Sequence, residues 1–179
     1  MIKNLFILFL LISLIACKSD NFYNTIRELE TDKDIYNIGD EIRITMKIFP
    51  QKGKKDIRVY ENYKNIDFSF SIVNDNKNIY NGYWSSTSGR HLPLSKIKKF
   101  TITKENPFSV EFVGKIDIEK DSISISFPRV NNYKVRFKKE LFEDSNTIIR
   151  IHGISNPISP ESGGSLEEYF NTKDFRIKL

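Results

Sequence analysis

The chain is poor in the residues that most often build helices. Among its 179 residues, Ala16 is the only alanine. A helical domain of this length without alanine would be very unusual, because alanine is the strongest helix former. Isoleucine, phenylalanine, tyrosine, threonine and serine are abundant instead, and these residues suit half-buried strands. We therefore predict an all-β protein.

The residues of common catalytic and metal sites are also scarce. The chain has one cysteine, Cys17, and two histidines, His91 and His152, and the histidines do not form a His-Glu-x-x-His motif. There is no Gly-x-Ser-x-Gly elbow and no glycine-rich phosphate loop. From these absences we predict a protein that is not an enzyme and that holds no metal and no cofactor.

The N-terminus carries a short apolar run. Lys3 is followed by twelve uncharged residues, 5–16. As a helix this run would be about 18 Å long, whereas the hydrocarbon core of a bilayer is about 30 Å thick. A basic start, a short apolar stretch and a small residue before a cleavage point are typical of a signal peptide. We predict a signal helix over residues 1–16, removed after export.

The end of this run, Leu14-Ile15-Ala16-Cys17, resembles the lipobox of bacterial lipoproteins. The resemblance implies cleavage between Ala16 and Cys17, a diacylglycerol on the Cys17 thiol and acylation of the new N-terminus, including palmitate. Two or three acyl chains hold a protein stably on a membrane. The alternative, an ordinary secretory signal, fits less well because Leu14 occupies the −3 position, where small residues are preferred. Lys18 favours the outer membrane, on its periplasmic or surface face, if the organism has two membranes.

In the mature chain, apolar and polar residues alternate along several segments, as in the strands of a β-sandwich. In Glu41–Phe49, apolar residues at every second position predict a strand with one buried face. Residues 66–84 predict a hairpin. We place a lipidated tether at 17–27 and a single β-sandwich domain at 28–179, with a C-terminal extension over 155–179. Further strands are expected at 57–61, 97–103, 108–118 (with a bulge or bend at Gly114), 122–127, 132–138, 147–152 and 175–179, and short helical turns at 140–144 and 165–168.

A second resemblance lies at residues 32–46. A polar turn, Tyr36, then Gly39-Asp40 and an alternating strand resemble the opening of bacterial immunoglobulin-like domains. Tyr36 is expected to pack across the first strand, and Gly39 to allow a tight turn into the second. The resemblance implies an antiparallel immunoglobulin-like β-sandwich. The stretch is also similar to the opening of small proteinase inhibitors built on this sandwich.

The charge of the chain is mildly basic, at +5. Nucleic acid is not an expected partner, because an exported protein seldom meets it. Two lysine clusters, Lys52–Lys55 and Lys96–Lys99, are interpreted as solvated loops and strand edges; contact with anionic lipid or polysaccharide is the alternative.

The segment 85–93 is the candidate binding loop. It follows Trp84 and combines hydroxyl groups with a basic residue and an imidazole; the candidate residues are Trp84, Ser86, Arg90 and His91. Polar and aromatic groups on a loop above a rigid sandwich commonly form a recognition surface. A serine hydrolase would also need a third orienting group and an oxyanion hole.

Three functions follow from these features. The first is a non-enzymatic binding or assembly lipoprotein of the cell envelope, whose partners are the membrane, through its lipid, and another envelope protein or polymer. The second is an inhibitor of a protease or other enzyme, using the 85–93 loop. The third is a hydrolase of envelope polymers, which requires converging carboxylates or a Ser–His pair.

Overall fold

The computed structural model describes residues 24–63, 66–74, 77–82, 94–128, 133–143, 147–156 and 168–179. This part of the chain is all-β, as the composition predicts, with three short 3₁₀ turns: η1 (Glu61–Tyr63), η3 (Leu94–Lys96) and η4 (Lys139–Phe142). It contains no helix with the length and apolar character needed to span a membrane. The signal helix predicted over 1–16 lies outside the described residues.

The first sheet has five strands in the order β1-β3-β8-β9-β10, all antiparallel. Their alternating sequences explain the assignment, because one row of side chains is buried and the other faces solvent. The strands are β1 (Thr25–Thr31), β3 (Glu41–Pro50), β8 (Phe108–Glu119), β9 (Ser122–Phe127) and β10 (Tyr133–Lys138).

The second sheet follows the path β2-β13-β11-β5-β6, and β12 pairs with β11 beside it. All of its pairings are antiparallel except the one between β2 and β13. The predicted hairpin is confirmed as β5 and β6, with a register shift after Ile72. The strands are β2 (Ile35–Asn37), β5 (Ile66–Asn74), β6 (Lys77–Gly82), β11 (Ile148–Ser155), β12 (Glu168–Tyr169) and β13 (Lys173–Lys178).

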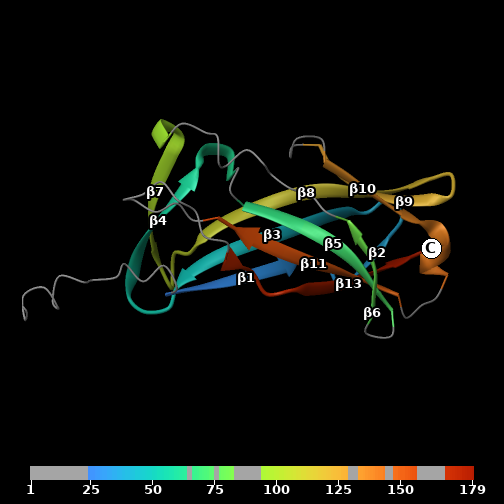
Figure 1. Ribbon diagram of the computed structural model, residues 1–179, viewed down its shortest axis with the longest axis horizontal. Coiled ribbons are helices and arrows are strands. Elements are labelled where there is room, and N and C mark those ends of the chain that lie inside the picture. Colours follow the sequence, from blue (N-terminus) through green and yellow to red (C-terminus); the bar gives the residue numbers. More distant parts are fainter. Residues whose placement is uncertain are drawn as a thin grey trace, which may run out of the picture.

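The two sheets pack face to face around one core, as in a β-sandwich (Figure 1). Phe68 of β5 joins the layers, because its ring lies 5.2 Å from that of Phe112 in β8 and 4.9 Å from that of Phe127 in β9. The first pair is tilted and the second is edge-on, and aromatic pairs in such geometries add to the stability gained from burial. The core is therefore built by the inward rows that the sequence alternation predicts.

A separate two-stranded ribbon projects from one end of the sandwich (Figure 1). It consists of β4 (Lys54–Tyr60) and β7 (Ile97–Thr103), which are antiparallel. Val59 and Ile102 are buried, and Phe100 packs against Phe108 of β8 with ring centroids 5.1 Å apart. One face of the ribbon thus holds it to the core, and the other face is free for polar side chains.

The segment that opens the domain is fixed by Tyr36 and Gly39. Tyr36 is fully buried; its hydroxyl donates a 2.6 Å hydrogen bond to Asp32, and its ring meets Phe175 of β13 edge-on at 5.3 Å. Burial, followed by the bond to Asp32, raises the pKa of this phenol. Gly39 has φ of +93°, which confirms the predicted tight turn into β3.

Gly114, predicted to mark a bulge or bend, does not mark a bulge. The pairing of β8 with β3 continues through Gly114 without a register shift. A Cβ at this position would lie 2.6 Å from Cε1 of Phe127 and 2.7 Å from the backbone oxygen of Ser126. The residue is glycine because the aromatic ring of the neighbouring strand lies directly over its backbone.

The structure also corrects three boundaries. Residues 25–27 are not tether, because β1 begins at Thr25 and pairs with the end of β3. The C-terminal residues 168–179 are not an extension, since β13 lies between β2 and β11 within the second sheet. The helical turn predicted at 140–144 is confirmed as η4, whereas Glu168, placed at the end of the other turn, begins β12.

Candidate functional site

The residues singled out by the sequence lie outside the described part of the chain. These residues are the anchor and cleavage positions Ala16 and Cys17 and the loop positions Trp84, Ser86, Arg90 and His91. Their roles therefore stay predictions. The structure does describe the two strands between which the candidate loop runs and a polar surface beside one of them.

The two attachment points of the loop lie in different sheets. At its N-terminal side, β6 ends at Gly82, which pairs with Phe70 of β5. At its C-terminal side, η3 begins at Leu94 and leads into β7 of the projecting ribbon. The segment 83–93 therefore connects the second sheet to the ribbon.

A serine and a histidine lie together on the outer face of the second sheet. Ser71 of β5 and His152 of β11 are hydrogen-bonded, with 2.9 Å between Ser71 Oγ and His152 Nε2. Alternation places both side chains opposite the core-facing row of Phe70 and Ile151, which pair with each other. Gly82, the last residue of β6, pairs with Phe70, which directly precedes Ser71 in β5. The end of β6 therefore lies beside the serine–histidine pair along the sheet.

An ion pair lies next to the serine–histidine pair. Arg150 of β11 binds Asp174 of β13 with both ends of its guanidinium fork, Nε to Oδ1 at 2.7 Å and Nη2 to Oδ2 at 2.8 Å. This bidentate geometry fixes both side chains. Their hydrogen bond raises the pKa of Arg150, so it is always charged. Because each side chain is about a third exposed, at 32% and 39%, both remain accessible to a ligand.

The surroundings of His152 favour the neutral form of its imidazole. Burial lowers the pKa of His152, and the charge of Arg150 lowers it further, while Asp174 acts in the opposite direction. A neutral imidazole offers one donor and one acceptor. Together with the Arg150–Asp174 pair, it gives this face a fixed set of hydrogen-bonding groups.

The arrangement differs from a catalytic triad in two respects. In a triad the carboxylate orients the histidine, whereas both oxygens of Asp174 are bound by Arg150. Ser71 is also only 1% exposed, so its hydroxyl is not open to a substrate in this conformation. Among the described residues, no three histidine, cysteine or acidic side chains gather in a way that suits a metal ion. In this conformation the serine–histidine pair is therefore not arranged for nucleophilic attack.

Comparisons with known proteins do not assign the chain to a family. No protein-family model matches it, and no curated protein does. Among solved structures it is similar to Spo0M, a sporulation control protein from Bacillus subtilis, with 13% sequence identity and a TM-score of 0.41. The match covers 87% of this chain and 50% of that one, so the chain spans half the length of Spo0M. A likeness this distant carries no argument about function.

Sequence reasoning placed His152 at the end of a strand, whereas it lies within β11, and it missed the partners of this residue. The alternation in β5 and β11 places Ser71 and His152 among the polar positions of their strands. The signal that would have joined them is the register between two strands 81 residues apart, and a single sequence does not contain it.

Proposed function

We propose that this protein is a lipid-anchored protein of the bacterial cell envelope that acts as a non-enzymatic binding or assembly module. The lipobox at Leu14–Cys17 carries the proposal, because it assigns the only cysteine of the chain to a membrane anchor. On this reading the sandwich is held near a membrane, in the outer membrane if the organism has two. Its partner there is another envelope protein or polymer.

The finer fold assignment is an immunoglobulin-like sandwich. Two features support it: the opening at residues 32–46 and the packing of two mainly antiparallel sheets around one core. In this opening Tyr36 is buried and Gly39 forms the turn, as expected for the first strands of an immunoglobulin-like domain. In this family of architectures, loops above the sandwich are the usual binding elements.

The binding groups that we propose are those of the loop 85–93 and, separately, those on the outer face of β11. Trp84, Ser86, Arg90 and His91 supply stacking and hydrogen-bonding groups at the loop, and the second sheet supplies the Arg150–Asp174 pair and His152. Such groups suit a polar ligand that accepts and donates hydrogen bonds, such as a polysaccharide or a peptide backbone.

The anchor is tested by Cys17→Ser. We expect the variant to leave the membrane fraction and to lose incorporation of labelled palmitate, because the thiol is the point of lipid attachment. Lys18→Ser is the matched control and should behave like the unchanged protein. Unaltered fractionation and labelling of Cys17→Ser would refute the anchor.

The binding role is tested with tagged protein purified from membranes with its lipid intact. Cross-linking before purification should capture the same envelope partner in repeated experiments, and Arg90→Ala with His91→Ala should reduce the yield. Lys139→Ala, in η4, serves as the control. Equal yields from all forms would exclude the loop as the binding surface.

A hydrolase is the second candidate, and the Ser71–His152 hydrogen bond is the observation that favours it. It requires a movement that uncovers Ser71, since the side chain is buried. A fluorophosphonate probe should then label the protein, and Ser71→Ala should abolish the labelling. Absence of labelling in the unchanged, membrane-bound protein would dismiss this function.

A further inference from the structure

The fold brings the two lysine clusters of the sequence onto one ribbon. Lys54 and Lys55 lie in β4, and Lys98 and Lys99 lie in β7. Register places the two clusters on paired strands, with Arg58 directly opposite Lys99. Like charges directly opposite each other destabilise a strand pair. The register therefore gathers positive charge on both strands of the ribbon.

The net charge of the ribbon equals the net charge of the whole protein. Residues 52–61 and 94–105, here called the cationic ribbon, contain eight lysines and arginines and three acidic residues, a net charge of +5. The complete chain contains 28 basic and 23 acidic residues, which is also a net of +5. The remaining 20 basic and 20 acidic residues therefore cancel.

Two acidic residues within the cationic ribbon are already paired. Asp56 binds Lys99 at 2.6 Å, and Glu61 lies 3.3 Å from Lys98 and 3.7 Å from Lys96. These lysines hold the pKa of both carboxyl groups below its usual range. Within the cationic ribbon, three exposed lysines form no ion pair with any residue that the structure describes, and all three lie at its base: Lys52, Lys54 and Lys104.

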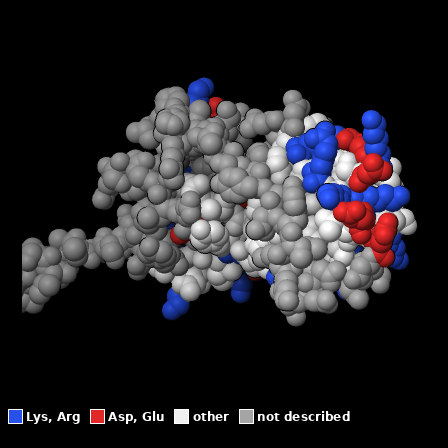
Figure 2. All heavy atoms as spheres, turned by 45° about the vertical axis from the view of Figure 1, so that its right-hand side comes forward, with Lys and Arg blue, Asp and Glu red and all other residues white. Residues whose placement is uncertain are grey.

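At the opposite end of the sandwich, basic and acidic side chains are mixed and form ion pairs with each other. Figure 2 shows basic and acidic side chains interleaved around β9 and β10. Lys115 binds Asp117 at 2.7 Å, Arg136 binds Glu119 at 3.2 Å, and Lys138 binds Glu140 at 3.3 Å. Charges of alternating sign largely cancel beyond a Debye length of about 8 Å in physiological salt. The cationic ribbon is thus distinguished by an excess of one sign.

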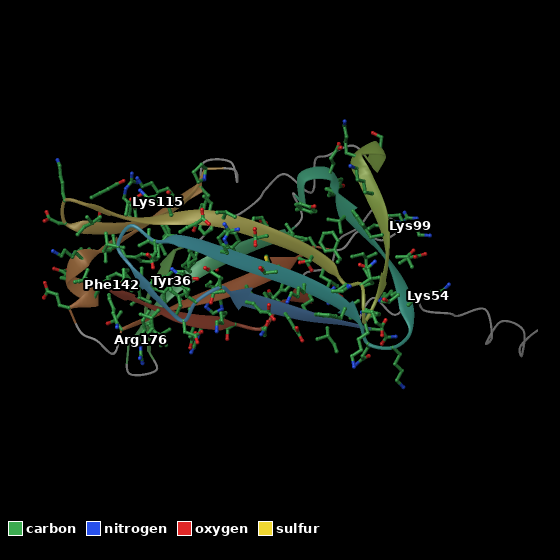
Figure 3. The ribbon with its side chains drawn as sticks, turned by 180° about the vertical axis from the view of Figure 1, so that it is seen from behind. Tyr36, Lys54, Lys99, Lys115, Phe142 and Arg176 are labelled. Carbon is green, nitrogen blue, oxygen red and sulfur yellow. The ribbon has the colours of Figure 1, made fainter. Side chains whose placement is uncertain are left out.

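The base of the cationic ribbon lies where the described chain begins. The backbone nitrogen of Gln51 donates a 2.8 Å hydrogen bond to the oxygen of Asn24, and Lys52 follows immediately. Seven residues, 18–24, separate Cys17 from β1, and seven residues span at most about 25 Å. Figure 3 shows Lys54 and Lys99 at one end of the molecule and Lys115 at the other. A lipid on Cys17 would therefore hold the lysine-rich end close to a membrane.

We propose that the cationic ribbon rests on the anionic headgroups of the membrane to which the protein is anchored, which orients the sandwich with β9 and β10 pointing away. This inference rests on the proposed lipid anchor. Each lysine near an anionic surface strengthens association by about fivefold. Lys52, Lys54 and Lys104 together should favour the surface-bound orientation by a factor on the order of a hundred.

The test uses the lipidated full chain on two kinds of vesicle, phosphatidylcholine alone and phosphatidylcholine with phosphatidylglycerol. Amine labelling followed by mass spectrometry measures the exposure of each lysine. We expect Lys52, Lys54 and Lys104 to be labelled at least tenfold more slowly on the anionic vesicles, and Lys115 and Lys138 to be unchanged. High salt should remove the difference, because it screens the attraction.

A pair of charge-matched variants completes the test. The ribbon variant replaces Lys52, Lys54 and Lys104 by Gln, which removes no ion pair between described residues. The control variant makes the same change at Lys115, Lys138 and Lys178. In the unchanged protein, Lys98 and Lys99 of the same ribbon should also be labelled more slowly on anionic vesicles. This protection should be lost in the ribbon variant and kept in the control variant.

The two proposals fail in different ways. If the protein stays on both kinds of vesicle but its ribbon lysines are labelled equally on both, the orientation is refuted and the anchor stands. If the protein leaves both kinds of vesicle, the anchor itself is refuted, and the orientation that rests on it falls too.

Discussion

Breaking the buried ion pair between Arg27 and Glu168 should strongly destabilise the open edge of the sandwich. Arg27 lies in β1 of the first sheet, and Glu168 lies in β12 beside the second. Their side chains are only 9% and 7% exposed, and Arg27 Nε also donates a 3.0 Å hydrogen bond to Ser155. Burial lowers the pKa of Arg27 to about 10, so the guanidinium remains charged at neutral pH.

Replacing Arg27 by Met removes one member of this pair and leaves the other charge in the interior. Loss of one partner of a buried pair costs about 3–5 kcal/mol, which is a large part of the roughly 5–15 kcal/mol that stabilises an ordinary domain. For a domain of this size the melting temperature should fall by about 6–20 °C. Thermal unfolding followed by far-ultraviolet circular dichroism measures the change.

Two further variants make the reasoning refutable. Arg27→Met combined with Glu168→Leu should recover much of the loss, because two apolar side chains can replace a buried pair at little cost. Arg43→Met is the control: Arg43 pairs with Glu41 and Glu111 at the surface, is 44% exposed, and should cost less than about 1 kcal/mol. A double variant as unstable as the sum of the single ones, or an Arg27→Met no worse than Arg43→Met, would contradict the argument.

Two other variants test the packing and the outer face. Gly114→Ala should destabilise the fold by about 1–3 kcal/mol, because the new Cβ would meet the Phe127 ring and the Ser126 backbone; Phe127→Leu in the same chain should recover only part of this in denaturant unfolding. His152→Asn should flatten the dependence of stability on pH. Since the folded state lowers the pKa of His152 from 6.5, the unfolded state binds the proton more readily, and stability should fall as the pH drops below about 6.5 toward the lower folded pKa. Urea unfolding at several pH values measures the slope, and an equal slope in the variant would exclude His152 as its source.

Most strands were predictable because their signal is local. The alternation in β3 or β9 places every second side chain on one face, so a few neighbouring residues suffice to identify the strand. β1 lacks this pattern: its inward row contains Arg27 as well as Leu29, and the sequence alone assigned its first residues to the tether. It becomes a strand through its pairing with β3 and through the ion pair with Glu168.

The candidate sites divide in the same way. The lipobox is a contiguous motif of four residues, so it is visible in the sequence and predicts an anchor without any structure. The polar surface of Ser71, His152, Arg150 and Asp174 joins three strands, and no local pattern predicts which strands are neighbours. Gly114 illustrates the same limit, because the ring that requires a glycine there comes from another strand.

The sequence by itself thus determined the strand content and the apolar faces, and it predicts an export signal, since each depends on residues close together in the chain. Only the tertiary structure decided which strands pair, which side chains meet on the outer face and where the charge gathers. The lysine clusters show the physical reason. Each is an ordinary charged segment, and pairing of β4 with β7 turns the two into one surface that carries the net charge of the protein.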